Sequence, residues 1–249
     1  MTTTQDERYR LADEESKKLI EAIVTSTSLK KVVVAGPGTG KTYLFRKIVE
    51  GKTNTLTLTF INALVEDLSL ELYGTSDVKT LHSFARSQLG KVVKGVKVYP
   101  KLSGYSDIIF ALAKYLEREK EKIPAYDQVL VDEFQDFNKL EISLIDLLSE
   151  KSQILLVGDD DQALYDDLKS ASAEHIRERF GDSETEYQPF GLPHCRRCTR
   201  VIVDAVNDVV SNAKDKGVVQ GRIDKRYEYF EEREKDLESE NNPKIIYSR

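Results

Sequence analysis

Cysteine is scarce in this 249-residue sequence, and long apolar runs are absent. Its two cysteines, Cys195 and Cys198, are too few for a zinc site, because zinc takes four ligands and only His194 lies beside them. A redox pair would need a thioredoxin-like strand and helix, which the pattern lacks, so we expect two reduced thiols packed beside a loop. No apolar run approaches the roughly 20 residues of a membrane span, and the polar start at residues 1–5 lacks a signal-peptide core. We therefore expect a cytoplasmic protein.

A surplus of positive charge is also absent. The chain has 43 acidic and 37 basic residues, a formal net charge of −6. This balance argues against a protein that coats nucleic acid by bulk electrostatics. One stretch is nevertheless basic, and it either follows a phosphate backbone or forms a solvated face. Its residues are Arg86, Lys91, Lys94, Lys97 and Lys101.

The chain is long enough to bury one substantial core. Of its residues, 40% are hydrophobic and 32% are charged. These values fit one domain with appendages and at most a small second unit. The sequence has no internal repeat and no low-complexity block.

A glycine-rich loop follows the β-branched run Val32–Val34, and the residues after the loop are typical of a helix through Val49. Glycines let successive backbone N–H groups point at one anion, and the helix N-terminus adds its positive dipole end. We expect Lys41 to reach the β- and γ-phosphates of a nucleotide and Thr42 to place its hydroxyl on Mg²⁺. This phosphate loop consists of Ala35, Gly36, Pro37, Gly38, Thr39, Gly40, Lys41 and Thr42.

Two further polar segments, residues 132–136 and 158–162, also follow apolar runs. Parallel sheets bind ligands at the carboxyl ends of their strands. We therefore expect Asp132 to hold Mg²⁺, and the neighbouring Glu133 to orient or deprotonate the attacking water. Gln162 is an amide placed to touch the γ-phosphate or its water.

Strand and helix signals alternate along the chain, which predicts an α/β fold with a mostly parallel sheet. A charged tail over residues 224–242 is expected to be a surface helix or a loosely held linker. The expected strands are 55–60, 78–81 and 244–247, and the expected helices are 11–24, 62–72, 108–116, 138–150 and 172–180.

Taken in order, these motifs resemble the N-terminal part of the UvrD/Rep/PcrA group of superfamily 1 DNA helicases. The phosphate loop matches the Ala-Gly-x-Gly-x-Gly-Lys-Thr form of that group, and the resemblance runs from about residue 11 to about residue 212. Segments 59–62, 80–84, 132–136, 158–165 and 192–202 resemble motifs Ia, Ib, II, III and IV. The resemblance implies a RecA-like P-loop NTPase with helices on both faces of its sheet and ATP and Mg²⁺ as cofactors. It also implies a single-stranded DNA or single/double-strand junction partner and 3′ to 5′ translocation by the full-length protein.

The resemblance also assigns residues around the nucleotide. Arg197 stands where relatives contact the γ-phosphate. Relatives sandwich adenine between an arginine just after the phosphate loop and a tyrosine just before the motif IV arginine. This chain has Tyr43 at the first position and Arg196 at the second, so the aromatic ring and the guanidinium have exchanged places. Residues 11–15 carry acids where relatives have a glutamine that reads adenine, which leaves adenine selectivity open.

A third set of residues is implied to contact DNA: Thr59, Phe60, Asn62, His82, Phe84 and Tyr165. Phe60 and Phe84 are equally well explained as core aromatics, and His82 as a residue that starts a helix. Relatives follow motif III with an aromatic residue, often tryptophan, on which a base stacks. This chain has no tryptophan, and Tyr165 is followed by Asp166. Since one base stack is worth about 1–3 kcal/mol, we expect weaker affinity for single strands.

The expected domain organisation follows the motifs. A RecA-like ATP-binding domain takes residues 1–84 and 125–212, a small helical subdomain is inserted at 85–124, and 213–249 form a charged linker and the start of a second, incomplete domain. Nothing after Arg222 resembles motifs V and VI of the missing second RecA-like domain. An arginine finger contributes about 10³–10⁵ in rate, so we expect feeble hydrolysis by this chain alone.

Two questions stay open at the level of sequence. The chain is either a fragment of a longer product or a natural truncation. It is also either the ATP-hydrolysing core of a helicase or a stand-alone nucleotide-binding module that regulates or scaffolds a partner.

Overall fold

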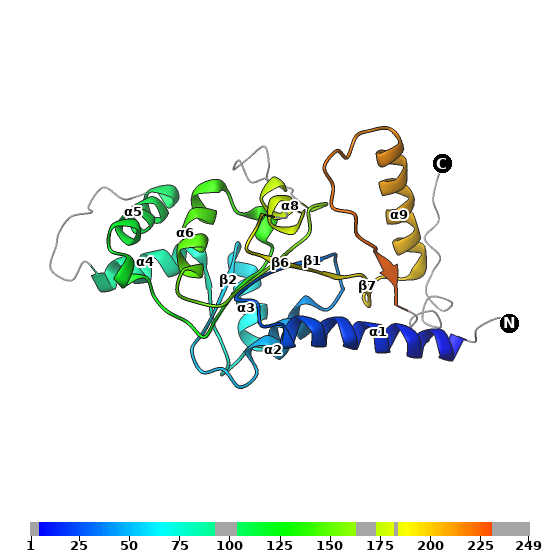
Figure 1. Ribbon diagram of the computed structural model, residues 1–249, viewed down its shortest axis with the longest axis horizontal. Helices are drawn as coiled ribbons and strands as arrows, with labels where there is room; N and C mark the ends of the chain where they lie inside the picture. Colours follow the sequence, from blue (N-terminus) through cyan, green and yellow to red (C-terminus); the bar gives the residue numbers. More distant parts are fainter. Residues whose placement is uncertain (1–4, 93–103, 163–172, 182–183, 231–249) are drawn as a thin grey trace. The chain divides into compact units, whose positions relative to one another are not determined.

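The computed structural model describes residues 5–92, 104–162, 173–181 and 184–230 (Figure 1). The chain divides into two compact units. The sheet unit comprises residues 27–34 and 42–190, and the loop unit comprises 1–26, 35–41 and 191–249. The domain boundaries predicted from the motifs stay a prediction.

A mostly parallel sheet forms the centre of the sheet unit. The strands lie in the order β3-β2-β4-β5-β1-β6. Strand β2 pairs in parallel with β3 and β4, β4 pairs with β5, and β5 pairs with β1. Their bounds are β1 (Lys30–Ala35), β2 (Thr55–Thr59), β3 (Asp77–Thr80), β4 (Gln128–Val131), β5 (Ile154–Gly158) and β6 (Gln188–Leu192).

The central strands are buried along their whole length. Every residue of β2, β4 and β5 is buried. Because successive side chains of a strand point to opposite faces, both faces of the sheet are covered, as continuous apolar runs predict.

Helices connect the strands of this unit. Helix α5 packs against both α4 and α6, and the three lie side by side (Figure 1). The helices are α2 (Lys41–Val49), α3 (Asn62–Glu71), α4 (Leu81–Val92), α5 (Tyr105–Arg118), α6 (Lys139–Ser149) and α8 (Glu174–Gly181), with short 3₁₀ turns at Lys120–Lys122 and Phe134–Asp136.

The loop unit contains α1 (Gln5–Thr25), β7 (His194–Cys195), α9 (Arg200–Asp215) and β8 (Glu228–Tyr229). Strands β7 and β8 pair in parallel, with His194 opposite Glu228 and Cys195 opposite Tyr229. Phe230 is buried directly after β8, and its ring meets Tyr9 of α1 edge to face, with 5.4 Å between ring centroids. Long-range aromatic contacts therefore join the first helix to the chain after α9.

The elements predicted over described residues match the structure with one clear exception, and the structure adds β6, β7 and α9, which the sequence pattern did not predict. The α/β architecture with a mostly parallel sheet is confirmed. The prediction of a helix or loose linker over 224–242 is wrong for its described part, because residues 228–229 form β8. The many charged residues of this segment predict an exposed helix or linker. Phe230 is nevertheless buried, and its burial depends on contacts that the local sequence does not reveal. The expected strand at 244–247 lies outside the described residues.

Within the described ranges, no helix is long and apolar enough to cross a membrane.

Candidate active site

The phosphate loop has the backbone of an anion cradle. Gly38 and Gly40 have φ values of 71° and 94°, a region that glycine adopts without a side-chain clash. The Thr39 hydroxyl donates to the Gly36 carbonyl at 2.8 Å and closes the turn. A Cβ built on Gly40 would meet no atom within 4 Å, so no described protein atom fills the space beside it. Helix α2 begins at Lys41, so its first N–H groups follow directly on the turn.

The motif IV segment contacts this loop within the loop unit. The backbone N–H of Arg196 donates to the Gly38 carbonyl at 2.8 Å. The Pro37 carbonyl accepts from the Tyr227 hydroxyl at 3.0 Å and from the Cys195 thiol at 3.3 Å. A Cβ on Gly38 would collide with the Cβ of Arg197. The close approach explains why glycine is required at position 38, and it brings the backbone of Arg197 next to the phosphate loop.

The motif II segment lies at the carboxyl end of β4. Asp132 is buried, and its backbone N–H donates to the Leu58 carbonyl at 2.9 Å. Glu133 has a left-handed backbone with φ of 49°, which is costly for a residue with a side chain. Such strain is concentrated at functional sites, where the surrounding structure holds it.

Gln135 links motif II to motif III. Its amide nitrogen donates to the Glu133 carboxylate at 3.0 Å, and its amide oxygen accepts from the Asp159 backbone N–H at 3.0 Å. A Cβ on Gly158 would lie 2.5 Å from that amide oxygen, so the bridge requires glycine at the end of β5. Sequence reasoning missed this bridge, although the unusual motif Asp-Glu-Phe-Gln-Asp contains the residue.

The motif III acids are engaged with one another and with α8. Gln162 donates its side-chain amide to the Asp159 carboxylate at 2.6 Å. Asp160, whose carboxylate is fully buried, pairs with Arg177 of α8 at 3.0 Å. The predicted role of Gln162 at the γ-phosphate stays a prediction. Arg177 was not foreseen, because an arginine 17 residues away carries no local signal.

The donor set suits a hard cation. The Thr42 hydroxyl and the Asp132 carboxylate are the two oxygen ligands expected from the sequence, and Mg²⁺ prefers oxygen ligands together with water and phosphate. The two positive-φ glycines leave room beside the loop for phosphate oxygens. The chemistry of Thr42 and Asp132 therefore fits Mg²⁺, and the backbone of the phosphate loop, taken by itself, fits phosphate oxygens.

At the position expected to stack on adenine, Arg196 already has partners. Its guanidinium carbon lies 3.6 Å from the centroid of the Phe230 ring, and one of its nitrogens lies 3.1 Å from a carboxylate oxygen of Asp13. Hydrogen bonds from Lys17 and Arg196 hold the pKa of Asp13 below its ordinary value. Tyr43 is half exposed. The exchanged adenine sandwich of Tyr43 and Arg196 stays a prediction. Asp13, one of the acids at residues 11–15, forms an ion pair with Arg196.

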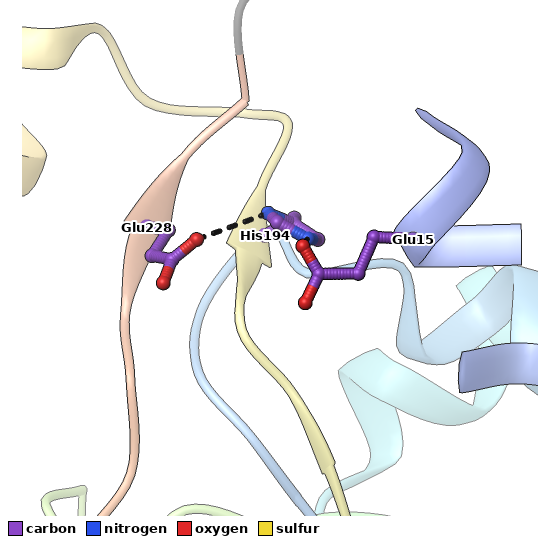
Figure 2. A group of neighbouring side chains, drawn as sticks. All are labelled: Glu15, His194 and Glu228. Carbon is purple, nitrogen blue, oxygen red and sulfur yellow. Dashed lines mark ion pairs between the residues drawn. The ribbon is translucent and has the colours of Figure 1, made fainter. Parts of the chain in front are cut away.

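A charged cluster joins three elements of the loop unit (Figure 2). The buried His194 ring lies between two carboxylates, with Nε2 at 3.2 Å from Glu15 and Nδ1 at 3.7 Å from Glu228. Arg226 pairs with the same two carboxylates at 2.8 Å and 3.1 Å. The Arg226 hydrogen bond is the largest cause that lowers the pKa of Glu15. Because Arg226 pairs with both acids and the two His194 nitrogens face different acids, we interpret the cluster as a set of polar contacts that ties α1, β7 and β8 together.

The residues expected to contact DNA differ in exposure. Thr59, Phe60 and Phe84 are buried, and the rings of Phe60 and Phe137 meet edge to face at 5.8 Å. Two of the set reach the surface: Asn62 is exposed and His82 is half-buried. Burial, followed by the nearby Arg86, lowers the pKa of His82. Tyr165 lies outside the described residues, as do Lys94, Lys97 and Lys101 of the basic stretch.

Comparison with known proteins gives the same assignment as the motifs. A sequence profile of the AAA domain family matches residues 19–167. DNA helicase II of Haemophilus influenzae is 30% identical over 120 residues, covering 46% of this chain and 16% of that protein. The ATP-dependent DNA helicase PcrA of Staphylococcus epidermidis is 29% identical over 171 residues, covering 64% of this chain and 23% of that protein. The chain thus spans less than a quarter of the length of these relatives.

Among solved structures, Bacteroides sp Pif1 in complex with ADP-AlF4 aligns with a TM-score of 0.46 and 17% identity, over 83% of this chain and 47% of that one. The matched profile includes the phosphate loop and the motif II acids. The chain belongs to the AAA domain family, and its motifs identify it as a UvrD-like superfamily 1 helicase N-terminal region.

Proposed function

We propose that the chain binds ATP with Mg²⁺ and hydrolyses the nucleotide. The observation that carries this proposal is the strand order, in which β4, β5 and β1 are adjacent and parallel. In register, Val34 pairs with Gly158 and Val131 pairs with Leu156, and one of the three polar motifs directly follows each strand. Parallel sheets bind ligands at this edge.

The proposed roles divide between binding and chemistry. The backbone of the phosphate loop and the Lys41 ammonium bind the phosphates, while Thr42 and Asp132 hold Mg²⁺. Mg²⁺ would neutralise charge on the β- and γ-phosphates when bound. Tyr43 and Arg196 are proposed to stack on the base. Gln162 and Arg197 are proposed to contact the γ-phosphate.

Glu133 is the proposed general base. When water attacks the γ-phosphorus, the bond to the ADP oxygen breaks and the attacking water loses a proton, which the Glu133 carboxylate accepts. The amide of Gln135 donates to that carboxylate at 3.0 Å and so orients it. We therefore regard Gln135 as a positioning residue.

Two variants separate binding from chemistry. Lys41→Ala should weaken binding of a fluorescent ATP analogue by about 10- to 100-fold, because a charge-assisted hydrogen bond contributes about 1.5–3 kcal/mol. Glu133→Gln should keep that affinity and lower turnover by about 100-fold or more, since a general base contributes 10²–10⁴. Folded wild-type protein that takes up neither ATP nor ADP with Mg²⁺ would refute the proposal.

For the whole gene product we propose 3′ to 5′ translocation on single-stranded DNA or at a single/double-strand junction, in the cytoplasm. The relatives DNA helicase II and the ATP-dependent DNA helicase PcrA support this proposal. Thr59, Phe60, Asn62, His82, Phe84 and Tyr165 are the proposed DNA contacts. Turnover by this chain without a second RecA-like lobe should be feeble, because an arginine finger contributes about 10³–10⁵.

A second candidate is a nucleotide-binding module that regulates or scaffolds a partner without motor action. The burial of Thr59, Phe60 and Phe84 favours it, since buried side chains offer little surface to DNA. Steady-state ATP turnover with and without single-stranded DNA separates the two. Stimulation by DNA supports the motor, and its absence at every DNA concentration supports the module.

A further inference from the structure

The two cysteines lie against the phosphate loop. The buried thiol of Cys195 donates to the Pro37 carbonyl at 3.3 Å, while Cys198 is partly exposed. The same carbonyl accepts from Tyr227 at 3.0 Å, and the next carbonyl, of Gly38, accepts from the Arg196 backbone at 2.8 Å. The cysteine-containing turn and the phosphate loop are thus joined by hydrogen bonds inside one unit.

The two cysteines lie three residues apart in one turn, and a hydrogen bond joins them. The backbone N–H of Cys198 donates to the Cys195 sulfur at 3.4 Å. That backbone nitrogen is only two bonds from the Cys198 Cβ, so rotation about χ1 of Cys198 is the motion that redirects its sulfur toward Cys195.

The surroundings of the two thiols differ in a way that suits disulfide exchange. Burial alone would raise the pKa of Cys195, but the nearby Tyr227 hydroxyl and the backbone N–H groups of Cys198 and Arg197 lower it below its ordinary value. Burial and the neighbouring Cys195 raise the pKa of Cys198. Cys195 therefore provides the more available thiolate, and Cys198 the sulfur that an outside reagent reaches.

We propose that Cys195 and Cys198 are a redox modification site, whose reversible disulfide weakens nucleotide binding at the phosphate loop. The nucleotide part of this inference rests on the proposed function. The oxidant is a low-molecular-weight disulfide, RSSR. The Cys198 sulfur attacks RSSR and releases one RS⁻, and the Cys195 thiolate then attacks the Cys198 sulfur and releases a second. The two cysteine protons leave with two RSH, so the dithiol loses two electrons and RSSR gains them.

The disulfide acts on the loop through the lost thiol proton. The oxidised Cys195 sulfur has no hydrogen to donate, so the Pro37 carbonyl loses one of its two donors. The loop has little freedom to adjust, because Gly38 already lies against Arg197. A net hydrogen bond of about 0.5–1.5 kcal/mol corresponds to about a 3- to 10-fold loss of nucleotide affinity.

The test uses the full chain in glutathione buffers from fully reduced to fully oxidised. Free thiols are counted by maleimide labelling and mass spectrometry, and affinity is measured with a fluorescent ATP analogue and Mg²⁺. Oxidised protein should have no free thiol, no bound glutathione and a mass lower by two hydrogens, and its affinity should fall about 3- to 10-fold. Dithiothreitol should restore both readouts.

Cys198→Ser is the matched control, because it removes the disulfide while leaving Cys195 against Pro37. It should bind nucleotide like the reduced wild type and show no response to oxidised glutathione. Two free thiols, or two glutathione adducts, at full oxidation would overturn the modification site. A disulfide that leaves affinity unchanged would overturn its coupling to the loop.

If the proposed nucleotide binding is wrong, the experiment gives a result that differs from failure of the disulfide. In that case the reduced protein binds no nucleotide, but the thiol count still reports the disulfide. Amide hydrogen exchange across residues 36–42 then tests the coupling without nucleotide. Faster exchange in the oxidised form supports it, and identical exchange in both forms overturns it.

Discussion

Gln135 shows how one side chain sets the geometry of two motifs. It is 2% exposed and bonds to both the Glu133 carboxylate and the Asp159 backbone. Gln135→Ala leaves a buried N–H without its acceptor, which costs about 1–3 kcal/mol of unfolding free energy. ATP turnover should also fall more than ATP affinity, because the carboxylate loses its orientation.

Urea unfolding and steady-state kinetics check this prediction. Gln153→Ala is the control, since Gln153 is exposed and its side-chain oxygen accepts a hydrogen bond from Lys52 at 3.1 Å. Equal losses of stability in both variants would contradict a special role for the Gln135 bridge.

Gly158 is constrained by the same bridge. A methyl group at position 158 would lie 2.5 Å from the Gln135 amide oxygen and 2.9 Å from Ile176. Gly158→Ala should therefore destabilise the protein by about 1–3 kcal/mol through overpacking. Thermal unfolding measures the change. In a Gln135→Ala background the penalty should shrink, and an undiminished penalty would show that Ile176 and the Phe134 backbone cause the clash without Gln135.

At the scale of elements, α6 begins with a capping box. The Asn138 side chain accepts from the backbone N–H groups of Leu140 and Glu141 at 3.0 Å, and Glu141 accepts from the Asn138 backbone at 2.9 Å. Asn138→Ala should cost about 1 kcal/mol of unfolding free energy, whereas Asn138→Asp should retain most of it. A denaturation series of the three proteins tests this order, and an alanine variant as stable as wild type would contradict it.

The entry to β4 carries a pH-sensitive contact. The Asp127 carboxylate accepts from the backbone N–H groups of Asn54 and Thr53 at 3.0 Å and 3.1 Å, and these bonds hold its pKa below the ordinary value. A depressed folded-state pKa contributes stability above the unfolded-state pKa, and that stability is lost as the pH falls through the folded-state pKa.

Asp127→Asn should therefore be less stable than wild type at neutral pH, and the difference should diminish toward about pH 3. Urea midpoints measured from neutral to acid pH check this. A difference that stays constant with pH would mean that the charge of Asp127 is not its cause.

At the scale of the whole molecule, nucleotide binding should stabilise the folded chain. Ligand at 100 times its dissociation constant adds about 2.7 kcal/mol, which for a chain of this size raises Tm by roughly 5–10 °C. Mg²⁺-ATP should produce this shift in wild type, and Lys41→Ala should lose it at the same concentration. An equal shift in the variant would mean that the ligand binds elsewhere.

Much of the fold was predictable from the sequence because its signals are local. The strands at 55–60 and 78–81 were located within a residue of β2 and β3, since β-branched runs and turn residues mark them. The backbone of the phosphate loop was equally predictable, because Gly38 and Gly40 supply the positive φ values that the turn needs. The segment around β8 was not, since the contact between Tyr9 and Phe230 joins residues more than 200 positions apart.

The sequence by itself determined the order of the motifs, the phosphate loop and the parallel strands, because each depends on neighbouring residues and on backbone preferences. Tertiary structure alone decided which side chains form hydrogen bonds to those motifs. These contacts are Gln135 to the Asp159 backbone, Arg177 to the Asp160 carboxylate, and Cys195 to the Pro37 carbonyl. Such contacts form only after distant segments are packed together, and their energies depend on burial that no local pattern encodes.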